Sequence, residues 1–381
     1  MAIQPFKVHI PNTTLNDLQE RLVQTRWPDE IPDSGWNHGT NLGYLKELVE
    51  YWKDKFDWRE QEAKLNRFEQ SKAQVDGVNI HFIHMRGKSS HPIPIILTHG
   101  WPDSFYRFYK VIPMLTDPEK FGGKAEDSFD VIVPSIPGFG FSDRKAMTDG
   151  AVAGLWAKLM TQVLGYDNFT AAGGDLGTGV TKSLALKHAD VVAAIHLTDV
   201  GYPTGQEDYS SMSEAERQFA GFTQRWLFTE GAYIMIQATK PQTLGYGLND
   251  SPIGLASWIV EKFYAWSDCK GNIEKSFTKD ELLTNVMIYW ITETINSSIR
   301  MYSENARSAY AQAPTTKLVR SQVPAAVASF PADVPFPREW AERNVDLKRW
   351  TKMPRGGHFA AMEEPELFVA DLREFFRGFR E

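Results

Sequence analysis

Short apolar runs without polar alternation are the strongest constraint on the fold of this 381-residue chain. They are "PIPIILT" (92–98), "FDVIVP" (129–134), "FTAA" (169–172) and "VVAAIHL" (191–197). Runs of this length are typical of strands that are buried on both faces of a parallel sheet. Helical stretches separate these runs, and such alternation predicts an α/β fold.

The first 75 residues have a different pattern, which is mostly helical. Thr14 and Asp17 can cap one helix, and Asn41 can cap a second helix with apolar residues at three- and four-residue spacing. We therefore expect residues 1–75 to form a helical meander packed on the main domain.

The rest of the chain divides into three regions. Residues 76–202 begin with an Asp76-Gly77 turn, which indicates a hairpin, and form the first part of the α/β core. Residues 203–318 show little strand signal and many aromatic residues at helical spacing, so we expect an inserted helical cap. Residues 319–381 return to strand patterns at 323–330 and 347–352 and end in an amphipathic helix, which predicts the second part of the core.

Composition narrows the function classes. The net charge is −7 and no run of Lys or Arg stands out, so we expect no nucleic-acid partner. Cys269 is the only cysteine, which indicates a reducing compartment. No stretch approaches the roughly 20 apolar residues that span a bilayer, and the N-terminus lacks the apolar core of a signal peptide. We therefore expect a cytoplasmic protein without a membrane partner.

Glycine-bearing turns follow four of the predicted strands: "THGWPDS" (98–104), "PGFGFSD" (137–143), "GGDLG" (173–177) and "RGGHF" (355–359). In open α/β sheets, ligands bind beyond the carboxyl ends of the strands. We therefore expect these turns to meet at one crevice.

The "GGDLG" turn places Asp175 where many hydrolases have a serine nucleophile on a sharp strand-to-helix turn. The glycines around it give the steric relief that such a turn needs. Asp175, Asp333 and His358 also follow one another in the chain order of nucleophile, acid and histidine in the α/β-hydrolase fold. These three residues form the predicted catalytic triad.

Several alternatives remain open at this point. Asp175 could simply cap a helix, and Asp199, in "HLTDV", could replace Asp333 as the partner of the histidine. His99 is expected to support its own turn. His81 and His84 are unsuited to share a metal ion, because residues i and i+3 of a strand point to opposite faces. We expect no metal and no cofactor.

A carboxylate nucleophile indicates what kind of atom is attacked. With an ordinary pKa of about 3.9, it is an anion at neutral pH and needs no base. Attack on a carbonyl would give a high-energy anhydride, whereas attack on a polarised saturated carbon gives an ordinary ester. His358 could then activate water against the carboxyl carbon of Asp175, with the backbone N–H groups of Trp101 and Leu176 as oxyanion donors.

Epoxide opening and carbon–halogen displacement share this scheme. A departing halide needs N–H donors, often from indoles, and the side chain of Leu176 beside the nucleophile cannot donate. An epoxide oxygen needs an acidic O–H group, and the cap is rich in tyrosine. Epoxide hydrolysis is favoured over a dehalogenase, and a non-catalytic small-molecule binder is the alternative from another class.

The chain resembles the epoxide hydrolases of the microsomal type over almost its whole length. The residues that carry the resemblance are "HGWP", "GGDLG", "NDSPIGLASWIVEKF", "DELLTNVMIYW" and "RGGHFAAMEEPE", together with the N-terminal meander. The resemblance implies an α/β-hydrolase fold with a helical cap and a reaction of an epoxide with water. It also implies a homodimer and a role in detoxification, and the chain is similar to soluble members of the group.

The resemblance also implies roles for individual residues. Asp175 is similar to the nucleophile, His358 to the base and Asp333 to its charge partner. Tyr233 and Tyr302 are similar to the two cap tyrosines that bind the epoxide oxygen, with Tyr289 as a competitor for the second. Leu176 stands where relatives often have tryptophan, which leaves the backbone donor in place and changes the pocket.

Overall fold

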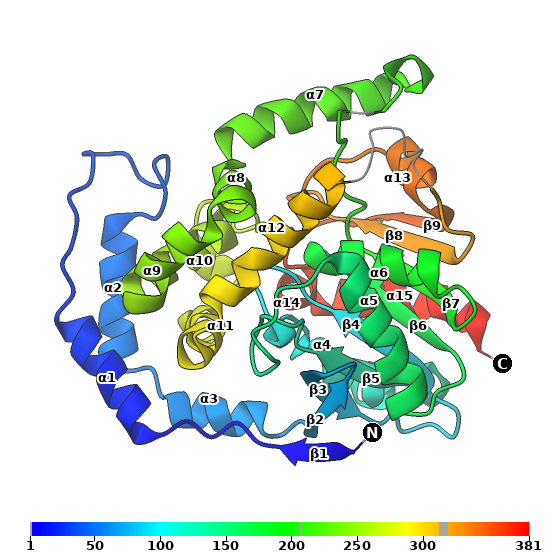
Figure 1. The fold of residues 1–381 in the computed structure, drawn as a ribbon, viewed down its shortest axis with the longest axis horizontal. Helices are drawn as coiled ribbons and strands as arrows, with labels where there is room; N and C mark the ends of the chain where they lie inside the picture. Colours follow the sequence, from blue (N-terminus) through cyan, green and yellow to red (C-terminus); the bar gives the residue numbers. More distant parts are fainter. Residues whose placement is uncertain (1, 206, 312–318, 381) are drawn as a thin grey trace.

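A nine-stranded sheet forms the centre of the molecule in the computed structural model, which describes residues 2–205, 207–311 and 319–380 (Figure 1). The strand order is β1-β2-β3-β5-β4-β6-β7-β8-β9. The strands from β5 to β9 pair in parallel, and β1, β2 and β3 extend one edge by antiparallel pairing. The predicted α/β architecture is therefore confirmed.

The strand bounds agree closely with the apolar runs of the sequence. They are β1 Ile3–Phe6, β2 Gln70–Val75, β3 Val78–Met85, β4 Ile93–Thr98, β5 Phe129–Pro134, β6 Phe169–Gly173, β7 Val192–Leu197, β8 Pro324–Ser329 and β9 Asp346–Lys352. Every residue of β5 and β6 is buried, as expected for strands covered on both faces. The hairpin is also confirmed, because Asp76 and Gly77 both have positive φ and join β2 to β3.

The N-terminal region contains three helices: α1 Asn12–Val23, α2 Leu42–Asp54 and α3 Trp58–Leu65. Asn41 caps α2 by accepting a hydrogen bond from the backbone N–H of Tyr44 at 2.8 Å, as predicted. The predicted cap at Thr14 is wrong, because α1 already begins at Asn12, after Pro11. Strand β1 was not predicted from the sequence, and only the end of β2 before the Asp76-Gly77 turn was. In Figure 1, α1 and α2 lie along the outside of the molecule, and both contact α10.

The remaining helices fall into two groups. Those around the sheet are α4 Val111–Thr116, α5 Asp149–Lys158, α6 Leu176–Lys187, α13 Arg338–Asn344, α14 Ala360–Glu363 and α15 Pro365–Phe376. Those between β7 and β8 are α7 Glu214–Thr229, α8 Ala232–Thr239, α9 Pro241–Asp250, α10 Pro252–Ala265, α11 Lys279–Thr292 and α12 Ile295–Ala311. We refer to α7–α12 as the cap helices; the exact division of the chain at residues 75, 202 and 318 stays a prediction.

Short single-turn helices complete the described structure. They are η1 Phe105–Phe108, η2 Pro118–Phe121, η3 Ala125–Asp127, η4 Leu159–Val163, η5 Tyr209–Ser211, η6 Ile273–Lys275 and η7 Arg377–Phe379. One buried apolar cluster includes residues of the meander, the sheet and the cap helices. The meander, the sheet and the cap helices therefore pack around one core.

Candidate active site

Asp175 occupies a strained turn between β6 and α6. Its φ of 59° and ψ of −129° lie in a region that residues with a Cβ atom rarely adopt. Glycine at position 177 makes this turn possible, because it lets the backbone of Thr98 approach closely. A Cβ atom on Gly177 would lie 2.1 Å from the carbonyl oxygen of Thr98. The turn directs the Asp175 carboxylate beyond the end of the sheet.

One oxygen of this carboxylate is held by two backbone donors. Asp175 Oδ1 accepts hydrogen bonds from the N–H of Trp101 at 2.8 Å and from the N–H of Leu176 at 2.6 Å. A Cβ atom on Gly100 would lie 2.3 Å from Oδ1, so glycine at this position leaves room for the carboxylate. These are the two donors predicted from the sequence to form the oxyanion hole.

The other oxygen faces His358. Asp175 Oδ2 lies 3.2 Å from Nε2 of His358, and Nδ1 of the same ring lies 3.2 Å from Oδ1 of Asp333. The backbone fixes the ring, because the His358 N–H donates to the Trp266 carbonyl and Arg107 donates to the His358 carbonyl. Asp175, His358 and Asp333 are therefore brought together.

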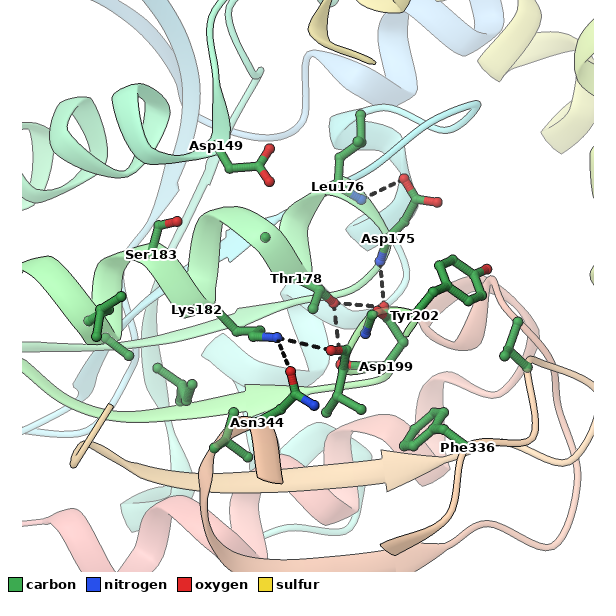
Figure 2. A pocket seen from close by; sticks show the side chains of 18 of the residues that line it. Asp149, Asp175, Leu176, Thr178, Lys182, Ser183, Asp199, Tyr202, Phe336 and Asn344 are labelled. Atoms are coloured by element: carbon green, nitrogen blue, oxygen red, sulfur yellow. Dashed lines mark hydrogen bonds between the residues drawn. The ribbon is translucent and has the colours of Figure 1, made fainter. Parts of the chain in front are cut away.

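Asp199, the alternative partner of the histidine, lies beneath the nucleophile instead. Its Oδ2 accepts hydrogen bonds from the backbone N–H of Asp175 and from the hydroxyl of Thr178, both at 2.7 Å (Figure 2). Asp333, and not Asp199, is hydrogen-bonded to the imidazole. Asp199 supports the turn that carries Asp175.

The charges of Asp175 and His358 stabilise one another. Burial disfavours the charged carboxylate, but His358 and the two N–H donors outweigh it, so the pKa of Asp175 lies below its ordinary value. Burial also disfavours the imidazolium, but Asp333 and Asp175 outweigh that effect and raise the pKa of His358 well above its ordinary value. The site therefore favours an ionised nucleophile beside a protonated histidine.

Two tyrosines from the cap helices line the same cavity as Asp175 and His358. Tyr233 on α8 is buried and stacks on Trp101, with ring centroids 5.4 Å apart. Tyr302 on α12 meets Tyr233 edge to face at 6.2 Å. Burial, with Asp175 nearby, holds the pKa of both hydroxyls well above about 10. Both hydroxyls therefore stay protonated and can donate.

Tyr289, the competitor for Tyr302, has another contact. Its hydroxyl donates a hydrogen bond to the backbone carbonyl of Asp103 at 2.5 Å, and the ring is buried. Tyr302, by contrast, lines the same cavity as Asp175 and His358. The geometry therefore favours Tyr302 as the second cap tyrosine.

A cavity of about 500 Å³ joins these residues. Its lining includes residues that the sequence analysis did not select, among them Asp149, Lys182, Tyr202 and Asn344. Lys182 lies on α6 two turns after Asp175 and donates to Asn344 Oδ1 at 2.8 Å (Figure 2). Burial lowers its pKa to about 8. Lys182 could have been predicted from the sequence, because a residue two turns after Asp175 lies on the same face of the helix. Asn344 and Asp149 lie far from Asp175 in the sequence, so no local pattern indicates that they line the cavity.

His99 and His81 have structural contacts. His99 bridges two turns, with Nδ1 2.9 Å from the Gly100 carbonyl oxygen and Nε2 accepting from the N–H of Ile136. The ring nitrogens of His81 lie 2.8 Å from the hydroxyl oxygen of Ser135 and 2.9 Å from Oε1 of Gln70. Within the described ranges, no group of three or more His, Cys, Asp or Glu residues could hold a metal ion.

Comparison with known proteins gives the family of this chain. Residues 3–108 match the family described as epoxide hydrolase N terminus, and residues 93–230 match the alpha/beta hydrolase fold. Epoxide hydrolase 1 of Sus scrofa is 38% identical over 406 residues, which cover 98% of this chain and 88% of the relative. The chain belongs to the epoxide hydrolase family.

Solved structures of epoxide hydrolases have the same architecture. The juvenile hormone epoxide hydrolase of the silkworm Bombyx mori superposes with a TM-score of 0.85 at 29% identity, covering 100% of this chain and 94% of that one. The Aspergillus niger epoxide hydrolase gives a TM-score of 0.84 at 29% identity, covering 99% and 97%. The fold is thus the α/β-hydrolase fold of this family. None of the helices in the described part of the chain is long and apolar enough to cross a membrane.

Proposed function

We propose that this epoxide hydrolase converts an epoxide and water to a vicinal diol through an ester on Asp175. The arrangement of the two Asp175 oxygens supports this proposal most directly. Oδ1 is bound by two backbone N–H groups, while Oδ2 faces the cavity and His358. A carboxylate held in this way presents one oxygen for attack and already has donors for the oxyanion that forms later.

In the first step, Asp175 Oδ2 forms a bond to one carbon of the oxirane. The bond from that carbon to the ring oxygen breaks, and the oxygen receives a hydrogen bond and then a proton from the Tyr233–Tyr302 pair. A neutral hydroxyl group is a suitable donor here, because an epoxide oxygen remains attached to the substrate and becomes an alkoxide.

In the second step, His358 removes a proton from water, which attacks the carboxyl carbon of Asp175. The oxyanion lies at Oδ1, between the N–H groups of Trp101 and Leu176. The acyl–oxygen bond then breaks and the departing oxygen takes the remaining hydrogen of the attacking water, which releases the diol and regenerates the carboxylate. The proton that water loses to His358 balances the proton that the tyrosines gave to the ring oxygen.

Ester formation itself prepares the histidine for this role. It removes the negative charge of Asp175, one of the two carboxylates that raise the pKa of His358. The pKa of His358 therefore falls when the ester forms, and the imidazolium passes its proton through solvent to the tyrosinate left by ring opening. The neutral ring can then act as the base at the step that needs one.

The same nucleophile could serve a dehalogenase, but a halide would need N–H donors beside it. The side chain next to the nucleophile is Leu176, which has none, whereas two tyrosines of the cap helices line the same cavity. A non-catalytic binder would not need Asp175 in a strained turn beside His358. Epoxide hydrolysis fits these groups best.

A trapped ester tests the proposal. In the His358→Gln variant, Asp175 can still open an epoxide such as styrene oxide, but water is no longer activated. Intact-protein mass spectrometry should show an increase equal to the mass of the epoxide, located at Asp175 by peptide mapping. The matched control is His358→Gln with Asp175→Asn, which should stay unmodified. An unmodified His358→Gln protein that binds the epoxide would overturn the scheme.

We also propose that the protein is a cytoplasmic homodimer without a membrane partner, with a role in detoxification. The single cysteine and the resemblance to soluble members of the group support this proposal. Light scattering coupled to size-exclusion chromatography should give twice the mass of 43.2 kDa. A monomer at micromolar concentration would contradict the dimer.

A further inference from the structure

A reciprocal pair of hydrogen bonds joins the cap helix α12 to the beginning of α5. The backbone N–H of Asp149 donates to Oδ1 of Asn305 at 3.0 Å, and Nδ2 of Asn305 donates to Oδ1 of Asp149 at 2.7 Å. The two residues are 156 positions apart in the chain. Asp149 also lines the cavity that contains the nucleophile.

A third element holds the Asp149 carboxylate from the other side. A Cβ atom on Gly179 of α6 would lie 2.1 Å from Asp149 Oδ2, so only glycine at this position admits the carboxylate. Figure 2 shows Asp149 above α6, on the side where Leu176 and Asp175 lie. The Asp149–Asn305 pair is thus seated on the helix that begins at the nucleophile.

Asn305 lies one turn after Tyr302 on α12, so the pair fixes the helix close to that tyrosine. An aspartate in the first turn of α5 also stabilises the helix by itself. That role requires neither an amide partner from the cap nor a glycine on α6. We propose that Asp149 and Asn305 are positioning residues that hold Tyr302 above Asp175 for ring opening.

This inference rests on the proposed function, and exchanging the two side chains tests it. In Asn305→Asp, a carboxylate oxygen replaces the Nδ2 donor. Burial raises the pKa of Asp149 to about 6, so the variant is assayed at a pH high enough to ionise both carboxyl groups, where the pair should open. In Asp149→Asn, the Asn305 amide still has an acceptor, so the pair should remain. In the double variant Asp149→Asn/Asn305→Asp, the new amide can donate in the opposite direction, so the pair should be restored.

The measurement separates the two chemical steps by rapid quenching and intact-protein mass spectrometry with styrene oxide. Asn305→Asp should slow ester formation by about tenfold, because a displacement of about 1 Å can cost about 100-fold. Hydrolysis of the ester, which uses His358, should be unchanged. The double variant should recover the rate of ester formation. In a Tyr302→Phe background, Asn305→Asp should have no further effect.

Gly179→Ala provides an independent test from α6, because it displaces the Asp149 carboxylate without changing either member of the pair. It should also slow ester formation and spare hydrolysis. Gly154→Ala is the matched control, since its Cβ atom would have no neighbour nearer than 4.0 Å. If a variant does not fold, Asn305→Ser removes the amide donor with a smaller disturbance.

The inference is overturned if Asn305→Asp leaves ester formation unchanged, slows both steps equally, or is not rescued by the exchange. Slowing of both steps would indicate a structural role for the pair. Failure of the proposed function is a separate result, because the unsubstituted protein would then form no ester on Asp175.

Discussion

Residues Asp175 and His358 keep their charges because each is the partner of the other. The carboxylate has a lowered pKa and the imidazole a raised one. The two reaction steps need opposite states of the histidine: ester formation tolerates imidazolium, whereas hydrolysis requires neutral imidazole. Acidity should therefore affect the two steps differently.

We predict that the Asp175 ester accumulates at mildly acidic pH. The lowered pKa keeps Asp175 ionised as pH falls, so ring opening continues. In the ester, Asp333 still raises the pKa of His358, so the ring becomes protonated as pH falls and hydrolysis slows. Rapid-quench mass spectrometry across a pH series measures both rates. Asp333→Asn should shift the loss of hydrolysis to lower pH, and a hydrolysis rate independent of pH would contradict the role of His358.

The cap tyrosines should act on ring opening alone. Tyr233→Phe and Tyr302→Phe each remove one donor to the epoxide oxygen, and loss of such a donor costs about 100-fold. The rate of ester formation should fall accordingly, and ester hydrolysis should not. Tyr289→Phe is the matched control, because its hydroxyl is bound to the Asp103 carbonyl. Equal rates in all three variants would show that the cap hydroxyls are not used.

At the scale of single elements, the helix caps offer a direct measurement. Asn41→Ala removes the side chain that accepts from the N–H of Tyr44, and we expect the free energy of unfolding to fall by about 1 kcal/mol. Thr14→Ala should cause no comparable loss, because Thr14 lies inside α1 and caps nothing. Urea titration followed by circular dichroism checks both. A larger loss at Thr14 would mean that α1 begins later in solution.

The elements differ in how well the sequence predicts them. Strands β4 to β7 are buried on both faces, and this burial is visible as continuous apolar runs. Strand β1, "IQPF", is mostly exposed at the antiparallel edge, and strand β2, "QSKAQV", contains a buried polar residue, Gln70. Pairing with a neighbour, and not local pattern, defines these two strands.

The residues of the site also differ in how well the sequence predicts them. Asp175 and His358 follow predicted strands, so chain order and turn composition identify them. Asp149 and Asn305 meet only through the docking of α12, and no local pattern marks them. The choice between Tyr302 and Tyr289 also required the structure, because both lie on helices of the same region.

At the scale of the whole molecule, meander, cap helices and sheet share one apolar core. Leu48 of α2 is fully buried, and α2 contacts α10 and α11. We predict that Leu48→Ala lowers the free energy of unfolding by about 2–5 kcal/mol. The loss should appear in a single transition, with tryptophan fluorescence and circular dichroism coinciding. Two separated transitions would indicate that the cap and the sheet unfold independently.

The unequal surroundings of the two Asp175 oxygens determine the origin of the atoms in the product. Oδ2 departs with the diol, and an oxygen of the solvent takes its place, while Oδ1 stays under the N–H groups of Trp101 and Leu176. In water enriched in oxygen-18, the first diol should thus be unlabelled. After many cycles the Asp175 peptide should contain one heavy oxygen and not two, since half of the carboxylate is renewed and half is permanent.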